Sequence, residues 1–338
     1  MKKIGSTLAK TSVPLIISAV ILYFTYRNYD FTAFWSDMKR IDWRWLALAL
    51  SFSAAGPFFR GIRWNLLLEP IGYNVPRKDT VLTVFTGYAA NIIIPRVGEI
   101  SRCGILENCA KVPFSKSLGT LVAERFVDAI LLGLIVLTTV LTNIPAFVKL
   151  FTPDDAVAAS AVDGTPLLQN PRFYIAVIAA IAIMTVLFII GRRMGLKEKL
   201  KSFINGFIDG FMALRKVRNL PLFMFYSLAI WACYYLELYL AFYCMPSTSQ
   251  AGMTAGLVCF AASSVAVLVP TPNGAGPWNL AIVKMLGIYG VPETDAQPFS
   301  FVLHLSQTLI YLLCGLFAWV ALRIIHRNDS TAAVRTDK

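Results

Sequence analysis

Charged residues at helical spacing open one of the apolar stretches of the sequence. Glu124 and Asp128 stand one helical turn apart, and Arg125 precedes Asp128 by three residues. Charged side chains in an apolar, membrane-like segment are costly unless they pair or face water. We therefore expect a paired network between helices, with Arg60 and Arg63 of an earlier apolar stretch as partners. The alternative is extension to the membrane surface, which explains the two arginines well but Asp128 poorly.

A second group of polar residues follows Asn91, where another apolar stretch runs into Pro95. A helix starting near Pro95 would place Arg96, Glu99 and Arg102 at i, i+3 and i+6, roughly on one face. An arginine fork suits a pair of phosphate oxygens, and Glu99 would hold an arginine in register. The alternative is a self-contained ion pair at the membrane surface.

A third group lies in the segment from Pro270 to Asn279, which interrupts a further apolar stretch. Asn273, Gly274 and Gly276 permit tight backbone and close approach of a ligand, and the proline that follows suits the first turn of a new helix. A helix N-terminus that faces a cavity attracts an anion such as phosphate. The alternative is a glycine hinge that only lets helices pack.

Two isolated groups, Glu237 and His304, lie within apolar stretches. Each is a candidate for proton coupling or for simple hydrogen bonding, and the second reading is favoured. The six Cys are scattered and the two His lie far apart, so the sequence has no residue spacing typical of a metal site. No nucleotide-binding loop is present either, and no cofactor is predicted.

The elements that position these residues must lie in a membrane. Of the 338 residues, 57% are hydrophobic and only 15% are charged, against roughly 25% charged in an ordinary soluble domain. The mean hydropathy is +0.63. The net charge of +12 is the excess expected of cytoplasmic loops, so no nucleic-acid partner is predicted. The fold class is an all-α polytopic membrane protein.

Six segments have the length and hydropathy of membrane spans. They are residues 11–27, 44–63, 119–143, 173–191, 220–244 and 299–323. Two further apolar stretches, 80–94 and 252–290, are interrupted by proline and glycine. We expect these two to form re-entrant or broken helical hairpins.

The distribution of Lys and Arg predicts the orientation of the spans. Basic residues gather at the N-terminus, within 192–218 and after the last span, whereas the loop 145–172 has no basic excess. Both termini are therefore predicted to be cytoplasmic, in the cell membrane. If six segments span the membrane, the segment 80–118 must enter and leave the membrane from the cytoplasmic side. The segment 251–298 must then enter and leave it from the outside. The halves then run in opposite senses, as in the inverted repeats of many transporters.

These expectations describe one transmembrane domain of residues 1–327. Its halves are about 1–191 and 220–327, joined by a basic amphipathic linker, 192–219, with a disordered polar tail at 328–338.

Four landmarks, taken in order and spacing, resemble the flippase-like transmembrane domain of lysylphosphatidylglycerol synthases over nearly the whole chain. They are Arg63-Trp64, Asn91 through Arg102, Glu124-Arg125 with Asp128, and Pro270-x-Pro272 with Gly274 and Gly276. Members commonly have a Glu shortly after the last glycine, where this chain has Pro277-Trp278-Asn279. The amide of Asn279 could still bind a headgroup. The resemblance implies a stand-alone member without the synthase domain that moves a lipid between leaflets.

The leading hypothesis is a lipid translocator rather than an enzyme. Arg96, Arg102 and the amides around Gly274 and Gly276 would hold an anionic headgroup while the chains remain in lipid. One alternative is a lipid or polyprenyl-phosphate glycosyltransferase that uses a buried carboxylate. Another is a non-transporting subunit of an envelope-synthesis complex. The expected partner is a membrane lipid, with a homo-oligomer or an envelope-synthesis protein left open.

Overall fold

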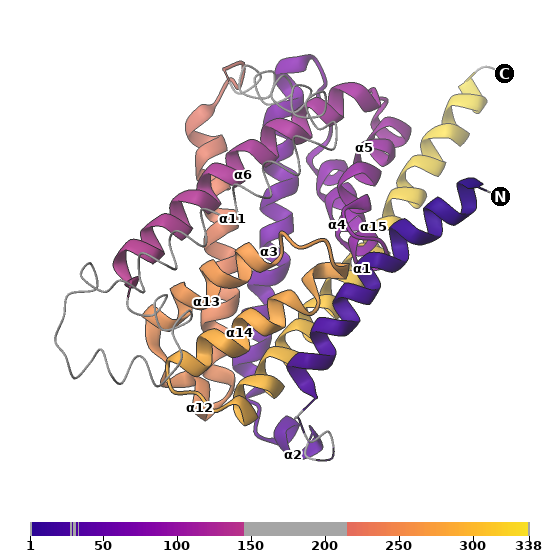
Figure 1. Cartoon of the computed structure of the whole chain (residues 1–338). Helices are drawn as coiled ribbons and strands as arrows, with labels where there is room; N and C mark the ends of the chain where they lie inside the picture. Colours follow the sequence, from indigo (N-terminus) through magenta and orange to yellow (C-terminus); the bar gives the residue numbers. More distant parts are fainter. Residues whose placement is uncertain (1, 28, 30–31, 33, 145–214, 337–338) are drawn as a thin grey trace, which may run out of the picture.

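The computed structural model describes residues 2–27, 29, 32, 34–144 and 215–336, which are almost entirely helical and contain no strand (Figure 1). The helices are α1 (Lys2–Tyr26), α2 (Phe34–Lys39), α3 (Trp43–Leu68), α4 (Arg77–Ile93), α5 (Val97–Ala110), α6 (Phe114–Thr142), α11 (Leu220–Ala241), α12 (Pro246–Ser249), α13 (Gly252–Ala266), α14 (Pro277–Ile288) and α15 (Glu293–Thr336). Short 3₁₀ turns lie at Glu69–Ile71, Phe242–Cys244 and Pro272–Gly274. The fold class of an all-helical membrane protein is confirmed.

Four of the six predicted spans correspond to helices long and apolar enough to cross a membrane. These segments are Trp43–Ile71, Phe114–Thr142, Leu220–Cys244 and Glu293–His326. The predicted span 11–27 lies in α1, but its apolar part, Pro14–Tyr26, is shorter than a full span. The predicted span 173–191, the external loop 145–172 and most of the linker 192–219 lie outside the described residues. The tail predicted to be disordered from residue 328 continues α15 to Thr336.

Two of the long helices, α3 and α11, begin at polar caps, and the long helices present apolar surface outwards. Asp42 accepts a hydrogen bond from the Arg44 amide at the start of α3, and Asn219 accepts one from the Leu222 amide at the start of α11. The outer faces of α6 and α15 carry large exposed apolar side chains, among them Leu141 and Phe317. Such a surface is stable only in lipid.

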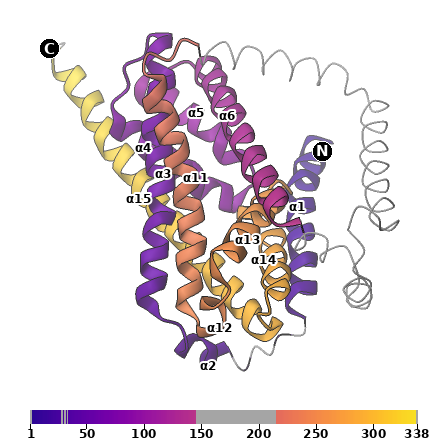
Figure 2. The same cartoon turned by 90° about the vertical axis from the view of Figure 1, so that its left-hand side faces the viewer.

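Helices α3 and α11 pack along their length at the centre of the molecule (Figure 2). Helix α15 packs on α4, while α6 packs on α13, and α1 lies against α14. Both termini lie towards the same end of the bundle (Figure 1). Buried apolar side chains form two clusters, one among α3, α11, α13, α14 and α15 and the other among α3, α4, α5, α6 and the start of α11.

The first interrupted stretch forms the α4–α5 hairpin. Arg96 takes a left-handed conformation, φ 65°, between the two helices. The Gly98 amide donates to Asn91 Oδ1 at 2.8 Å, so Asn91 caps α5. A Cβ on Gly98 would lie 1.8 Å from the Gly87 carbonyl oxygen, and only glycine allows the two helices to approach this closely.

The second interrupted stretch runs from α13 through the turn Pro272–Gly274 into α14. Arg96 donates to the Leu268 carbonyl at 2.7 Å, just after α13 ends. The tips of the two interruptions therefore meet, although they are far apart in sequence. Gly276 has φ 93°, and a Cβ there would lie 3.0 Å from the Ser18 carbonyl oxygen of α1. The glycine turn is thus packed against α1.

Candidate functional site

A network of buried ion pairs joins α3, α5 and α6. Arg60 Nη1 lies 2.7 Å from both Glu124 Oε1 and Asp128 Oδ2. Arg63 Nη1 lies 2.8 Å from Asp128 Oδ1, and Arg102 Nη2 lies 3.0 Å from Glu124 Oε2. All five side chains are buried. The predicted pairing of Arg60 and Arg63 with Glu124 and Asp128 is therefore confirmed.

Arg125 extends the network towards the surface. Its guanidinium lies 2.6 Å from Glu124, 3.2 Å from Asp128 and 3.2 Å from Glu99. The Arg125 and Glu99 side chains are 37% and 38% exposed, in contrast to the buried members. Arg125 is therefore the most exposed cation of this network.

The arginines are also held by neutral neighbours. Arg63 donates to Ser227 Oγ of α11 at 2.9 Å. The Arg102 guanidinium lies 4.6 Å above the Trp64 ring, a favourable cation–π distance. Trp64 itself donates to Thr120 Oγ1 at 2.9 Å. These contacts hold the side chains of Arg63 and Arg102 in place.

The network contains more positive charge than negative. Its four arginines face three carboxylates, so one positive charge is in excess. The Nε atoms of all four arginines are buried and have no hydrogen-bond partner among the described residues. A buried donor left unsatisfied costs roughly 1–3 kcal/mol. The network therefore favours an additional anion.

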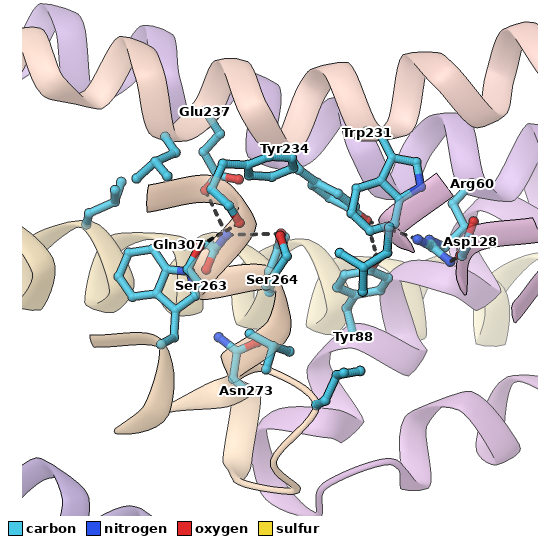
Figure 3. Close-up of a pocket in the computed structure, with 18 of the residues that line it drawn as sticks. Arg60, Tyr88, Asp128, Trp231, Tyr234, Glu237, Ser263, Ser264, Asn273 and Gln307 are labelled. Atoms are coloured by element: carbon cyan, nitrogen blue, oxygen red, sulfur yellow. Dashed lines mark hydrogen bonds and ion pairs between the residues drawn. The ribbon is translucent and has the colours of Figure 1, made fainter. Parts of the chain in front are cut away.

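A cavity of about 400 Å³ begins at this network and extends between the two halves of the bundle. Arg60 and Asp128 line one end (Figure 3), and Arg125, which contacts Asp128, also lines the cavity. Six aromatic side chains line the walls, namely Tyr88, Trp231, Tyr234, Phe260, Trp278 and Tyr311. The volume is within the range of small-molecule sites, 300–1,000 Å³, and an aromatic wall with few polar groups is typical of them.

Glu237 lies at the other end of the cavity, as Figure 3 shows. It is buried, and its Oε1 accepts a hydrogen bond from Gln307 Nε2 at 2.8 Å. Two tyrosine hydroxyl groups stand between the ends. Tyr234 OH is 2.6 Å from Tyr88 OH and 3.4 Å from Arg60 Nη2. The two charged ends are thus separated by phenol groups.

The structure brings together only part of the predicted site. Arg63, Glu99, Arg102, Glu124, Arg125 and Asp128 form the ion-pair network. Arg96 does not join them, because its left-handed conformation places it before the first turn of α5 rather than on the helix face. Arg102 points into the protein instead. The expected common face of Arg96, Glu99 and Arg102 is therefore not formed.

The glycine turn makes its own hydrogen bonds. The Gly274 amide donates to the Thr271 carbonyl, and the Gly276 amide donates to Asn279 Oδ1. Asn279 is buried and also donates to Tyr26 OH at 3.1 Å. Both glycine amides are therefore already occupied, and Asn279 joins α14 to α1.

Asn273 lines the cavity, and His304 lies behind Asn273 and contacts its backbone. The Asn273 carbonyl lies 3.1 Å from His304 Nε2, and its side chain donates to Thr308 Oγ1 at 2.8 Å. The His304 ring stacks on Trp278, with centroids 5.3 Å apart. His304 therefore shapes one wall of the cavity through Asn273 and Trp278.

Several cavity residues could not be selected from the sequence. Tyr88, Trp231, Gln307 and Tyr311 look like ordinary members of apolar helices. Only Gln307 carries a signal, because an amide is uncommon in an apolar span and lies three residues after His304. In the described residues, no group of three or more His, Cys, Asp or Glu side chains could hold a metal ion.

Comparison with known proteins places the chain in a family. UPF0104 membrane protein PH1989 of Pyrococcus horikoshii is 24% identical over 293 residues, which cover 82% of this chain and 87% of that protein. No solved structure matches the chain. The family described as the lysylphosphatidylglycerol synthase TM region matches residues 12–315. With nearly its whole length matched, and with the membrane helices described above, the chain belongs to the lysylphosphatidylglycerol synthase TM region family.

Proposed function

We propose that this protein moves a lipid with a phosphate-bearing headgroup between the two leaflets of the cell membrane. One observation carries the proposal: a headgroup-sized cavity lies among membrane helices and ends at an arginine network with an excess positive charge. The headgroup occupies the cavity while the hydrocarbon chains stay in the bilayer.

Phosphate fits the arginine end of the cavity. Arg125 is partly exposed, and Arg60 lines the same wall. Arginine binds phosphate oxygens through paired N–H donors, and such charge-assisted hydrogen bonds are about twice as strong as neutral ones. A phosphate there would neutralise the excess charge at modest desolvation cost, because the arginines are already held in position.

The helix packing supports an inverted repeat as the transport scaffold. In the proposed repeat, α3, α4–α5 and α6 correspond to α11, α13–α14 and α15. The first helices of the two halves, α3 and α11, pack together, and each hairpin packs on the third helix of the other half. Such reciprocal packing suits a site that opens to each side in turn. The basic termini then lie in the cytoplasm.

The buried carboxylates favour transport over group transfer. A general base must be free to accept a proton from a substrate. Glu124 instead contacts four arginines, and Asp128 contacts three. Both carboxylates serve to hold the arginines, so the glycosyltransferase alternative has no base at this end of the cavity.

The test is leaflet exchange in liposomes that contain the purified protein. Fluorescent phosphatidylglycerol and a short polyprenyl phosphate are compared for the wild type and Arg125→Gln. We expect protein-dependent exchange that falls about tenfold or more in the variant, the effect of losing one charge-assisted hydrogen bond.

Arg218→Gln is the matched control, because Arg218 is an exposed arginine paired only with Glu69 in the described residues. It should leave exchange unchanged. Arg96→Ala is a third variant. It tests whether Arg96, at the tip of the α4–α5 hairpin, binds the headgroup as expected from the sequence. Wild-type exchange in Arg125→Gln would contradict the proposed headgroup site.

A further inference from the structure

We propose that Glu237 binds an ammonium group of the transported headgroup. The headgroup then carries a phosphate at one end and an ammonium at the other, as phosphoethanolamine does. This inference rests on the proposed function and names the substrate class of the same cavity.

Glu237 is a buried carboxylate without a cation. Its side chain is 4% exposed, and Gln307 donates to one of its oxygens. No Lys, Arg or His side chain lies within ion-pair distance of it in the described part of the chain. An ionised carboxylate in a membrane segment is costly unless a cation pairs with it. A ligand that carries a cation would therefore stabilise the ionised form of Glu237.

The charges of the cavity are separated in the way that a zwitterion requires. The arginine network at one end has one positive charge in excess, and at the other end Glu237 supplies one negative charge when it is ionised (Figure 3). Phosphate and ammonium placed in this order complement both ends at once. A headgroup with phosphate alone would leave Glu237 without a cation.

The walls between the ends also favour a cation near Glu237. Tyr234 lies beside Glu237 in Figure 3, and Trp231, Phe260, Trp278 and Tyr311 also line the cavity. Aromatic faces attract ammonium groups through their quadrupole, and the attraction is strongest where water is excluded.

The experiment compares two lipids that share acyl chains and fluorophore, phosphatidylethanolamine and phosphatidylglycerol. Exchange of each is measured in liposomes containing the wild type, Glu237→Gln or Asp79→Asn. Glu237→Gln keeps the shape and an acceptor oxygen for Gln307. Asp79→Asn is the matched control, since Asp79 is another buried carboxylate and does not line this cavity.

We expect the wild type to move phosphatidylethanolamine about tenfold faster than phosphatidylglycerol. This factor corresponds to the free energy of one charge-assisted hydrogen bond. Glu237→Gln should bring that ratio close to one, mainly by slowing phosphatidylethanolamine, and Asp79→Asn should leave it unchanged. Equal slowing of both lipids in Glu237→Gln would overturn the inference and point to a proton carried by Glu237.

A binding measurement separates this inference from the proposed function. Short-chain forms of the same two lipids are titrated against the detergent-purified protein, with Trp231 and Trp278 as fluorescent reporters in the cavity wall. Tighter binding of the ethanolamine lipid that is lost in Glu237→Gln supports the inference even if no lipid is moved. Equal binding of both lipids to the wild type overturns it, even if transport is observed.

Discussion

Glu124 is the residue on which the ion-pair network depends. It contacts Arg60 and Arg63 of α3, Arg102 of α5 and Arg125 of its own helix. The pairing could be predicted from the sequence because a charge in an apolar helix must find a partner. The direction in which Arg96 points could not, because one left-handed residue decides it.

Removal of the Glu124 charge should therefore destabilise the fold strongly. Glu124→Gln leaves buried arginines with one anion fewer, and breaking a buried ion pair in this way costs about 3–5 kcal/mol. Glu99→Gln is the control, because that pair is partly exposed and an exposed pair contributes about 1 kcal/mol or less. Unfolding of both variants in detergent gives the comparison. Equal loss of stability would show that the network does not depend on Glu124.

The hairpins are the elements that place the site. In α4–α5, the close contact of Gly87 and Gly98 sets the direction of α5, which carries Glu99 and Arg102 to the network. Proline and glycine in the sequence predicted that both stretches are interrupted. The meeting of their tips through Arg96 and Leu268 was not predictable, because it depends on how distant elements pack.

A methyl group at Gly98 should therefore disrupt the hairpin. The added Cβ would lie 1.8 Å from the Gly87 carbonyl oxygen, and because that atom is backbone, α5 must move away from α4. Overpacking of this kind costs about 1–3 kcal/mol or more, so Gly98→Ala should unfold at lower temperature and transport lipid more slowly.

Gly104→Ala is the matched control on the same helix. A Cβ at Gly104 meets no atom within 4 Å, and alanine favours a helix over glycine by about 1 kcal/mol. Its stability should stay the same or rise. A stable, active Gly98→Ala variant would show that the close approach of the two helices is not required.

At the scale of the whole molecule, the four long helices follow from the hydropathy of the sequence, but their partners do not. Apolar surface alone allows α4 to pack on any neighbour, whereas in the structure it packs on α15, from the other half. Helix α13 packs on α6 in turn, which is the contact that the proposed inverted repeat requires. An inverted repeat would make the starts of α6 and α15 equivalent positions on opposite sides of the membrane.

Ser115 and Thr294 test this topology, because they are exposed residues at the starts of α6 and α15. Each is replaced by Cys in a variant whose six native cysteines have been removed. A membrane-impermeant thiol reagent added to intact cells should label Thr294→Cys, and Ser115→Cys should react only after the membrane is opened. The reason is the basic excess at both termini, which places the start of α6 inside. Labelling of both positions from the same side would rule out the inverted repeat, and with it the reciprocal opening of the cavity to the two leaflets.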